Sequence, residues 1–292
     1  MLVPLLAELM RSRRLIQVIG FLVWLMPGLP VQAQAPVRAI THLAGDVYRF
    51  QDNQHYSVFM VTPEGVIATD PISLDAASWL NGEIERRFHQ PVKYVVYSHD
   101  HRDHVTGAAG FPDATIVAHV NALGPISASE HAIELPDITF SSELTLTLGG
   151  KKVHLYYLGV SHSDNLIYME FPAEKILFAV DAVSVNRLPF EDFAGTDIDG
   201  LIGALTALEQ MDIDIVAPGH GQTGTLADLR AHREYIEMLK DQVTELLRDG
   251  KTENEIKAII TMPQYSQWES WGLWQQQNVD GMIAYVKAHY RI

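Results

Sequence analysis

Alternating apolar and polar positions divide the first part of the chain into short strands and one helix. Four strand-like runs are separated by turns that contain Gly, Asn or Pro, a pattern typical of an antiparallel meander. The spacing then predicts a helix over 74–88, and Pro91 precedes a further apolar strand over 92–97. The four runs of the meander are 38–43, 47–50, 57–61 and 66–69.

The rest of the chain repeats this order of strands followed by helices. Because the order occurs twice, we expect an α/β (α+β) fold in which two β-sheets pack face to face with helices outside each sheet. Between the two halves we expect a short helix over 105–111, a strand over 115–118 and a helical piece from Val120. The later strands are 144–148, 152–158, 166–171, 175–180 and 213–217, and the later helices run from Thr196 or Asp197 to Met211 and over 226–248, 253–260 and 279–289.

The N-terminal segment 1–35 differs from the rest of the chain. Arg11, Arg13 and Arg14 precede an apolar run over 15–26, and Pro and small residues follow it, which is the order of a secretory signal peptide. An uncleaved membrane anchor is the alternative, although the run is short for a bilayer span. We therefore expect one domain over 36–292, a periplasmic or secreted location, and no stable membrane association after signal cleavage.

Charge and cysteine content narrow the classes of partner and ligand. The chain of 292 residues has a formal net charge of −15 and no cysteine. An acidic surface repels phosphate backbones, so we expect a small-molecule substrate and no nucleic acid. Without thiolates, any metal must be held by His and carboxylate side chains alone. The oligomeric state stays open.

The densest chemical signal follows the strand over 92–97. The run 98–104 contains His99, His101 and His104 together with Asp100 and Asp103. Imidazole and carboxylate groups are ligands that Zn²⁺ prefers. If the chain stays extended, alternation places the first two histidines on one side and aims Asp103 and His104 at a second point. One loop can then serve two metals, whereas the alternative is a solvated polar loop.

Three later strands are also followed by possible ligands: His162 and Asp164 in the loop 159–165, Asp181, and His220 between two glycines. Loops at strand ends can point side chains at one spot. Taken alone, His162 and Asp164 are explained as turn formers, Asp181 as a helix cap and His220 as a surface residue flanked by glycines. Together with the histidine-rich run they favour a metal site.

These motifs resemble the metallo-β-lactamase superfamily over essentially the whole chain after the signal segment. They are His-x-His-x-Asp-His at 99–104, Gly-x-x-His-Ser at 159–163, an Asp after an apolar strand, and Gly-His-Gly at 219–221. The resemblance implies a four-layered αββα sandwich with a two-metal cleft along the edge of the sheets. It implies a first metal on His99, His101 and His162, a second on Asp103, His104 and His220, Asp181 as the bridge, and Asp70 as a buried carboxylate that supports the histidine loop.

Two Zn²⁺ ions about 3.5 to 4 Å apart lower the pKa of a shared water and provide a hydroxide that attacks a carbonyl. Asp103 or Asp181 can accept or relay the proton, which makes them the catalytic candidates. The sequence therefore predicts an exported hydrolase with two Zn²⁺ per chain, while iron and manganese stay open as the metal.

Two positions, Asp181 and Ser184, differ from the residues found in some known branches of the superfamily, and these differences bear on the substrate. Zinc β-lactamases of the most studied branch resemble this chain except for a Cys in place of Asp181 and a Lys at the position of Ser184. A bridging Asp resembles the glyoxalase II thioesterases and the acyl-homoserine lactonases, but the lactonases carry Tyr at the position of Ser184. We expect a small cyclic amide or ester as substrate. The alternatives are a thioester or general ester, an iron-dependent oxygenase on the same fold, and a metal-binding protein without catalysis.

Four residues are candidates for substrate contacts: Ser184, Asn165, Tyr56 and Trp271. His55 and Tyr56 are expected in a loop where family members carry a flap over the metals. Arg187 is a candidate partner for an anionic group. Because Trp268, Trp271 and Trp274 are spaced at three, core packing along one helical face is the first interpretation of their pattern.

Overall fold

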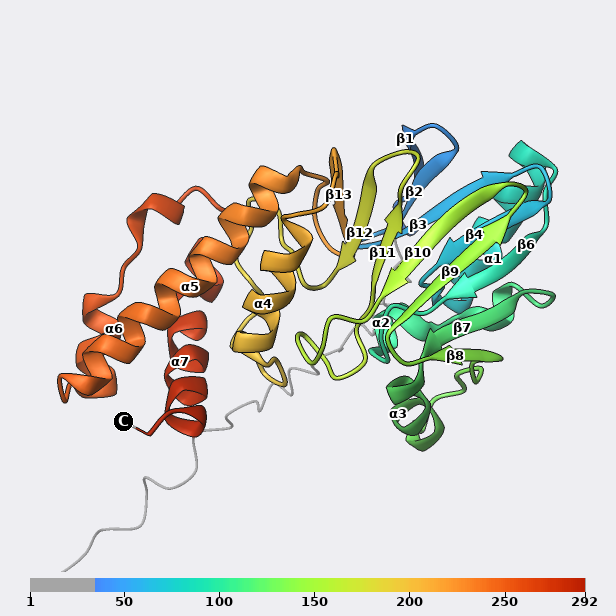
Figure 1. The fold of residues 1–292 in the computed structure, drawn as a ribbon. Coiled ribbons are helices and arrows are strands. Elements are labelled where there is room, and N and C mark those ends of the chain that lie inside the picture. The colour runs from blue at the N-terminus through green and yellow to red at the C-terminus, as the bar shows by residue number, and fades with distance from the viewer. Residues whose placement is uncertain (1–34, 292) are drawn as a thin grey trace, which may run out of the picture. The chain divides into compact units, whose positions relative to one another are not determined.

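The computed structural model describes residues 35–291, which form two β-sheets with helices on their outer sides (Figure 1). The expected signal peptide lies outside the described residues. None of the described helices is both long enough and apolar enough to cross a membrane.

The first sheet has seven strands in the order β1-β2-β3-β4-β6-β7-β8. Its first four strands are antiparallel neighbours, so the meander predicted from the sequence is confirmed. From β4 onward the strands run parallel to their neighbours. The strands are β1 (Arg38–Ala44), β2 (Val47–Asp52), β3 (His55–Thr62), β4 (Gly65–Thr69), β6 (Val92–Val96), β7 (Thr115–His119) and β8 (Ile138–Phe140), with the two-residue β5 (Ile72–Ser73) beside them.

The second sheet has five strands in the order β13-β12-β11-β10-β9. Its pairs are antiparallel except that β12 and β13 run parallel. The strands are β9 (Glu143–Leu148), β10 (Lys151–Tyr156), β11 (Tyr168–Phe171), β12 (Ile176–Val180) and β13 (Ile215–Pro218).

The helices cover the two outer faces, which gives the expected αββα sandwich. Helix α1 (Leu74–Phe88) packs Leu80 and Ile84 against the outer face of the first sheet. A second buried cluster joins the inner faces of both sheets, for example Met60 and Leu155, and extends to the helices behind the second sheet. Burial of each such large apolar side chain contributes about 1.5 to 3 kcal/mol. The helices behind the second sheet are α4 (Ile198–Leu208), α5 (Leu226–Arg248), α6 (Glu253–Ile259) and α7 (Trp271–His289).

Local side chains set the helix starts. Asp197 caps α4 by accepting a hydrogen bond from the Gly200 amide at 3.0 Å, so the cap predicted at this residue is confirmed. Thr225 and Asp228 form a capping box at the start of α5. These contacts fix the first turns of the two helices α4 and α5, which lie behind the second sheet.

The prediction of one helix over 105–111 is wrong. The chain instead forms the short α2 (Arg102–Val105) and a 3₁₀ turn at Ala108–Gly110. Between them a Cβ on Gly107 would lie 2.5 Å from the Ser73 carbonyl oxygen, so two backbones approach closely here. The remaining short helical pieces are a 3₁₀ turn at Val120–Ala122, α3 (Leu123–Ala128) and a 3₁₀ turn at Pro263–Tyr265.

Two further elements differ from the expectation. Strand β8 has no counterpart in the sequence prediction, because three residues are too few to show a recognisable alternation of apolar and polar positions. Helix α7 begins at Trp271 rather than at 279. Its first turns bury Gln275 and Asn278, whose amides donate to backbone carbonyls, so a polar stretch forms part of the core side of the helix.

Candidate metal centre

Seven side chains meet where the carboxyl ends of several strands face one another. The loop after β6 supplies His99 and His101, and α2 directly after it supplies Asp103 and His104. The other three follow β10, β12 and β13, and they are His162, Asp181 and His220. A strand end is a rigid support, so each of these loops holds its side chain in a fixed direction.

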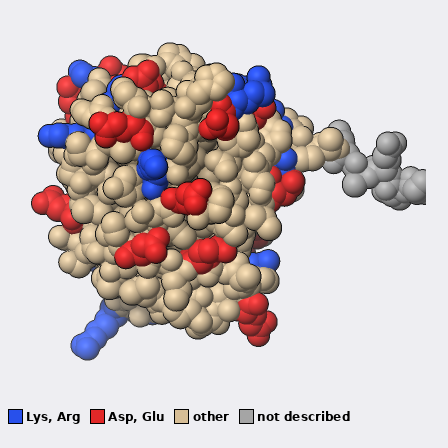
Figure 2. Space-filling view, turned by 90° about the vertical axis from the view of Figure 1, so that its right-hand side faces the viewer, with Lys and Arg blue, Asp and Glu red and all other residues tan. Residues whose placement is uncertain are grey.

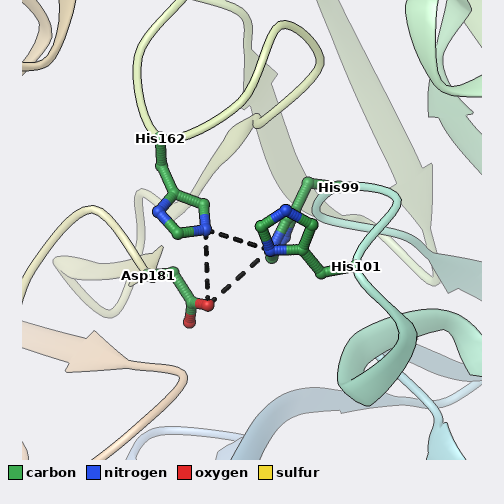
Figure 3. Close-up of side chains that lie close together, drawn as sticks. All are labelled: His99, His101, His162 and Asp181. Atoms are coloured by element: carbon green, nitrogen blue, oxygen red, sulfur yellow. Dashed lines mark hydrogen bonds and ion pairs between the residues drawn. The ribbon is translucent and has the colours of Figure 1, made fainter. Parts of the chain in front are cut away.

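The first group contains His99, His101, His162 and Asp181, whose ligand atoms all lie within 4.8 Å of one another. His162 Nε2 is 3.1 Å from His101 Nδ1 and 3.7 Å from Asp181 Oδ2. Figure 3 shows these four side chains pointing toward one common space. Three imidazoles and one carboxylate around a single point form a donor set of the kind that binds Zn²⁺.

The second group contains Asp103, His104, Asp181 and His220, again with ligand atoms within 4.8 Å of one another. Asp103 Oδ2 is 3.2 Å from His220 Nε2, and Asp181 Oδ2 is 3.3 Å from His104 Nε2. Asp181 belongs to both groups. One carboxylate can therefore contribute to two neighbouring cation sites.

The centre of the two groups contains polar atoms that a cation would satisfy. Among residues 35–291, His99 Nε2, His104 Nε2 and Asp181 Oδ1 are buried and have no hydrogen-bond partner. Each such atom costs about 1 to 3 kcal/mol when it stays unpaired. Gly219 leaves the space open, since a Cβ there would lie 2.7 Å from Asp181 Oδ1. The residues present therefore fit a pair of divalent cations.

Hydrogen bonds behind the centre orient the histidines. Asp70 is fully buried and accepts from the Ser98 amide at 2.8 Å, from the Ser98 hydroxyl at 2.7 Å and from His104 Nδ1 at 2.8 Å. His99 Nδ1 lies 2.9 Å from the Ser98 hydroxyl, and His220 Nδ1 donates to the Gln54 carbonyl at 3.0 Å. With Nδ1 engaged, each of these three rings directs the lone pair of Nε2 toward the centre.

The shifted pKa values of His99, His162, Asp103 and Asp181 also favour metal binding. Burial lowers the pKa of His162 to about 4 and lowers that of His99 well below its usual value, so both rings are neutral at pH 7. Burial would raise the pKa of Asp181, but the charge of His104, whose Nε2 is 3.3 Å from Asp181 Oδ2, holds it well below its usual range. Burial likewise opposes ionisation of Asp103, but the nearby rings of His220 and His55, with Nε2 atoms 3.2 and 3.5 Å from Asp103 Oδ2, lower its pKa. Burial lowers the pKa of His104, but Asp181 and Asp70 raise it well above its usual value, so this ring carries a proton when no metal is bound. Neutral imidazoles and ionised carboxylates are the forms that ligate metals, so a cation at the second group would replace the His104 proton.

A cavity of about 450 Å³ opens beside the centre. Of the four candidate substrate contacts, Ser184 lines it, together with Arg187, which was proposed as an anion partner. Further described residues in its wall are His55, Pro189, Phe190, Phe193, Leu201, His232 and Trp274.

The other three candidates, Tyr56, Asn165 and Trp271, do not line this cavity. Tyr56 lies within β3 rather than in a loop, and its ring centroid is 3.7 Å from the guanidinium carbon of Arg49. Asn165 is buried and bonds to both the amide and the carboxylate of Asp100, so it supports the histidine loop. Trp271, like Trp268 and Trp274, packs partly buried against the main core.

Two residues at the site were not singled out by the sequence pattern. Arg49 is buried beneath the loop of His220, and alternation in β2 could have revealed it, since Arg49 shares the inner face with buried Val47. His232 lies buried in α5 at the cavity wall. A lone His on an apolar helical face gives no signal that separates a core position from a cavity wall.

Comparison with known proteins agrees with this geometry. The family model described as the metallo-beta-lactamase superfamily matches residues 74–220. Over 201 residues the chain is 30% identical to the 2,4-dinitroanisole O-demethylase subunit alpha of Nocardioides sp. (strain JS1661), covering 65% of this chain and 58% of that protein. It is 28% identical to the metallo-beta-lactamase type 2 of Bacillus cereus, covering 48% of this chain and 56% of that protein.

A third relative is the linear primary-alkylsulfatase of Pseudomonas sp. (strain ATCC 19151), which is 22% identical over 69% of this chain and 49% of its own length. The chain thus spans about half the length of the curated relatives it matches. Among solved structures, the metallo-beta-lactamase from Pontibacter korlensis matches with a TM-score of 0.62 and 22% identity, over 69% of this chain and 99% of that one. The DIM-1 metallo-beta-lactamase matches with the same TM-score and 20% identity, over 70% of this chain and 99% of its own. At these identities the structural matches bear on the fold alone.

Proposed function

This chain belongs to the metallo-beta-lactamase superfamily, and from that premise we propose that it is a di-zinc hydrolase that opens a small cyclic amide or ester. The observation that carries the proposal is the position of Asp181, which belongs to both ligand groups. A protein that only stored metal would not need a shared carboxylate beside an open cavity. Thioester hydrolysis and iron-dependent oxygenation are the alternatives.

When bound, a pair of Zn²⁺ ions supplies positive charge to polarise an ester or amide oxygen and a nucleophile drawn from water. The seven ligands hold the ions, and Asp70 keeps His104 in the required orientation. The Asp103 side chain is 42% exposed and its Oδ2 lies 3.2 Å from His220 Nε2, so its carboxylate is placed to receive a proton at the mouth of the site.

The cavity wall supports a substrate with an anionic group and an apolar body. The guanidinium carbon of Arg187 lies 4.7 Å from the centroid of the Trp274 ring. The nearest carboxylate oxygen to its Nε among the described residues, on Glu269, is 3.8 Å away. This ion pair with Glu269 is longer than a hydrogen bond, so the Arg187 guanidinium can also bind a carboxylate or sulfate of the substrate, while Phe190 and Phe193 contact the apolar part. This combination makes a sulfate ester, as in the name of the alkylsulfatase relative, a second candidate substrate.

We further propose that the protein is exported and acts on a small molecule. The export rests on the signal-like pattern of residues 1–35. Figure 2 shows acidic side chains interspersed with basic ones across one face of the molecule. The formal net charge of −15 is what favours a partner other than nucleic acid.

Removal of metal is expected to abolish turnover, because the nucleophile depends on the cations. The protein is dialysed against a chelator and reloaded with Zn²⁺, Mn²⁺ or Fe²⁺. It is then tested with a chromogenic cephalosporin, a lactone, an aryl ester, a thioester and an alkyl sulfate, with metal content measured in each case. Restoration by two Zn²⁺ per chain supports the proposal. Activity that requires iron and consumes dioxygen would instead identify an oxygenase, and no turnover of any member of the panel would contradict the hydrolase proposal.

Replacement of Arg187 by Met is expected to raise KM for an anionic substrate about tenfold or more, with a smaller change in kcat, because charged hydrogen bonds to the bound substrate are lost. Arg187→Lys keeps the charge and serves as the matched variant with an intermediate KM. A neutral analogue of the same substrate is expected to show equal KM in all three proteins. Equal losses for charged and neutral substrates would mean that Arg187 does not recognise an anion.

A further inference from the structure

Arg49 is a buried cation whose hydrogen-bond partners among residues 35–291 are backbone carbonyls rather than carboxylates. The residue is 7% exposed on the inner face of β2. Its Nη2 donates to the Pro218 carbonyl at 2.8 Å and to the Gly221 carbonyl at 2.7 Å, while Nε is buried without a partner. Burial lowers the pKa of Arg49 to about 10, so the side chain still carries its charge at pH 7. Burying a charged group costs free energy, and its hydrogen bonds offset that cost only in part. A role for the contacts of Arg49 would explain why the charge is buried.

The two carbonyls that Arg49 binds lie on either side of His220. The segment between them is Gly219-His220-Gly221, and Gly221 has a φ of +84°, a conformation that favours glycine. A loop with glycine on both sides of the histidine has many accessible conformations in the absence of long-range contacts. Arg49 supplies such contacts from the first sheet, across the sandwich.

Strand β3, which pairs with β2, contacts the same loop. The Tyr56 amide donates to the Gly219 carbonyl at 2.8 Å, and the Tyr56 ring lies on the Arg49 guanidinium. The ring of His220 is in turn fixed through Nδ1 by the Gln54 carbonyl. Arg49 and Tyr56 therefore act on the backbone of the loop, and the Gln54 carbonyl acts on the imidazole.

We propose that Arg49, stacked on Tyr56, is a positioning residue for His220: by binding the carbonyls on both sides of the histidine, it holds Nε2 beside Asp103 and Asp181. In the resulting geometry His220 Nε2 lies 3.2 Å from Asp103 Oδ2 and 3.6 Å from Asp181 Oδ1. The expected effect of Arg49 on metal affinity at the second group rests on the proposed di-zinc function, whereas its expected effect on the conformation of the loop does not.

The first test is hydrogen–deuterium exchange of the metal-free protein. In Arg49→Met, the peptide that contains residues 218–222 is expected to exchange about tenfold faster than in the wild type, because two hydrogen bonds to the loop are lost. The peptide around His162 is expected to exchange at the wild-type rate. Arg38→Met is the matched control, since Arg38 pairs with Asp52 on the outer side of the first sheet. Unchanged exchange at 218–222 in Arg49→Met would overturn the proposal whatever the metal content.

The second test is titration of Zn²⁺ and Co²⁺ against a competing chelator, with His220→Ala used to identify the binding step of the second group. Arg49→Met is expected to weaken that step about 10- to 100-fold and to leave the other step unchanged, as is usual when a partner that orients a ligand is removed. Arg49→Lys keeps the charge, and its affinity in that step is expected to lie between those of the wild type and Arg49→Met. It is also the test variant if Arg49→Met does not fold. Uptake of a single ion by the wild type would contradict the di-zinc function, and the exchange result would still decide the role of Arg49. Two ions bound with wild-type affinity by folded Arg49→Met or Arg49→Lys would refute the positioning role alone.

Discussion

Replacement of Asp181 by Asn is expected to lower metal-dependent turnover by about three orders of magnitude or more. Asp181 Oδ2 lies 3.3 Å from His104 Nε2 and 3.7 Å from His162 Nε2, and Oδ1 lies 3.6 Å from His220 Nε2. An amide removes the negative charge that both ligand groups share. The cations contribute several kcal/mol to the transition state, and each loss of about 1.4 kcal/mol corresponds to a tenfold lower rate.

The measurement is kcat/KM for whichever substrate of the panel the wild type turns over, together with the metal content and the thermal melting temperature. Asp212→Asn is the matched control, because Asp212 is an exposed carboxylate paired with Lys175 far from the centre. The Asp181 variant should remain folded, since the main core does not depend on this side chain. Full metal content with turnover within tenfold of the wild type would remove Asp181 from the proposed role.

The fold was largely predictable because its signals are local. Strand runs, turn residues and the Asp197 cap each depend on a few neighbouring positions. The candidate ligands share this property, since each one lies in the loop or short helix that follows an apolar strand. Their convergence could be expected as soon as the strands were assigned to one edge of the sandwich.

The parts that could not be predicted depend on distant contacts. Helix α7 starts in a Gln- and Asn-containing stretch that becomes buried only because Asn278 donates to the carbonyls of Pro189 and Glu191. Tyr56 was expected near the substrate, but its ring packs on Arg49, a contact that local spacing does not encode. The supporting residues of a site are thus harder to identify from sequence than the residues at its centre.

Gly219 provides the sharpest steric test of the centre. Replacement by Ala is expected to reduce metal affinity and turnover by at least about 100-fold, since a Cβ would lie 2.7 Å from Asp181 Oδ1 and 3.0 Å from His104 Cε1. Neither neighbour can move freely, because Asp181 is shared by both ligand groups and His104 is fixed by Asp70. The added methyl group therefore displaces ligand atoms rather than a flexible surface side chain.

Gly203→Ala is the matched control, because a Cβ at Gly203 in α4 meets nothing within 4 Å. Glycine is also the poorer helix former, so this control should be at least as stable as the wild type and fully active. Both variants are compared by zinc content, by chelator titration and by kcat/KM. A Gly219→Ala protein that binds two zinc ions with wild-type affinity would show that the space between Asp181 and His104 is not the metal centre. An affinity for zinc at least about 100-fold below that of the wild type, in a metal-free protein that remains folded, is the result that the geometry predicts.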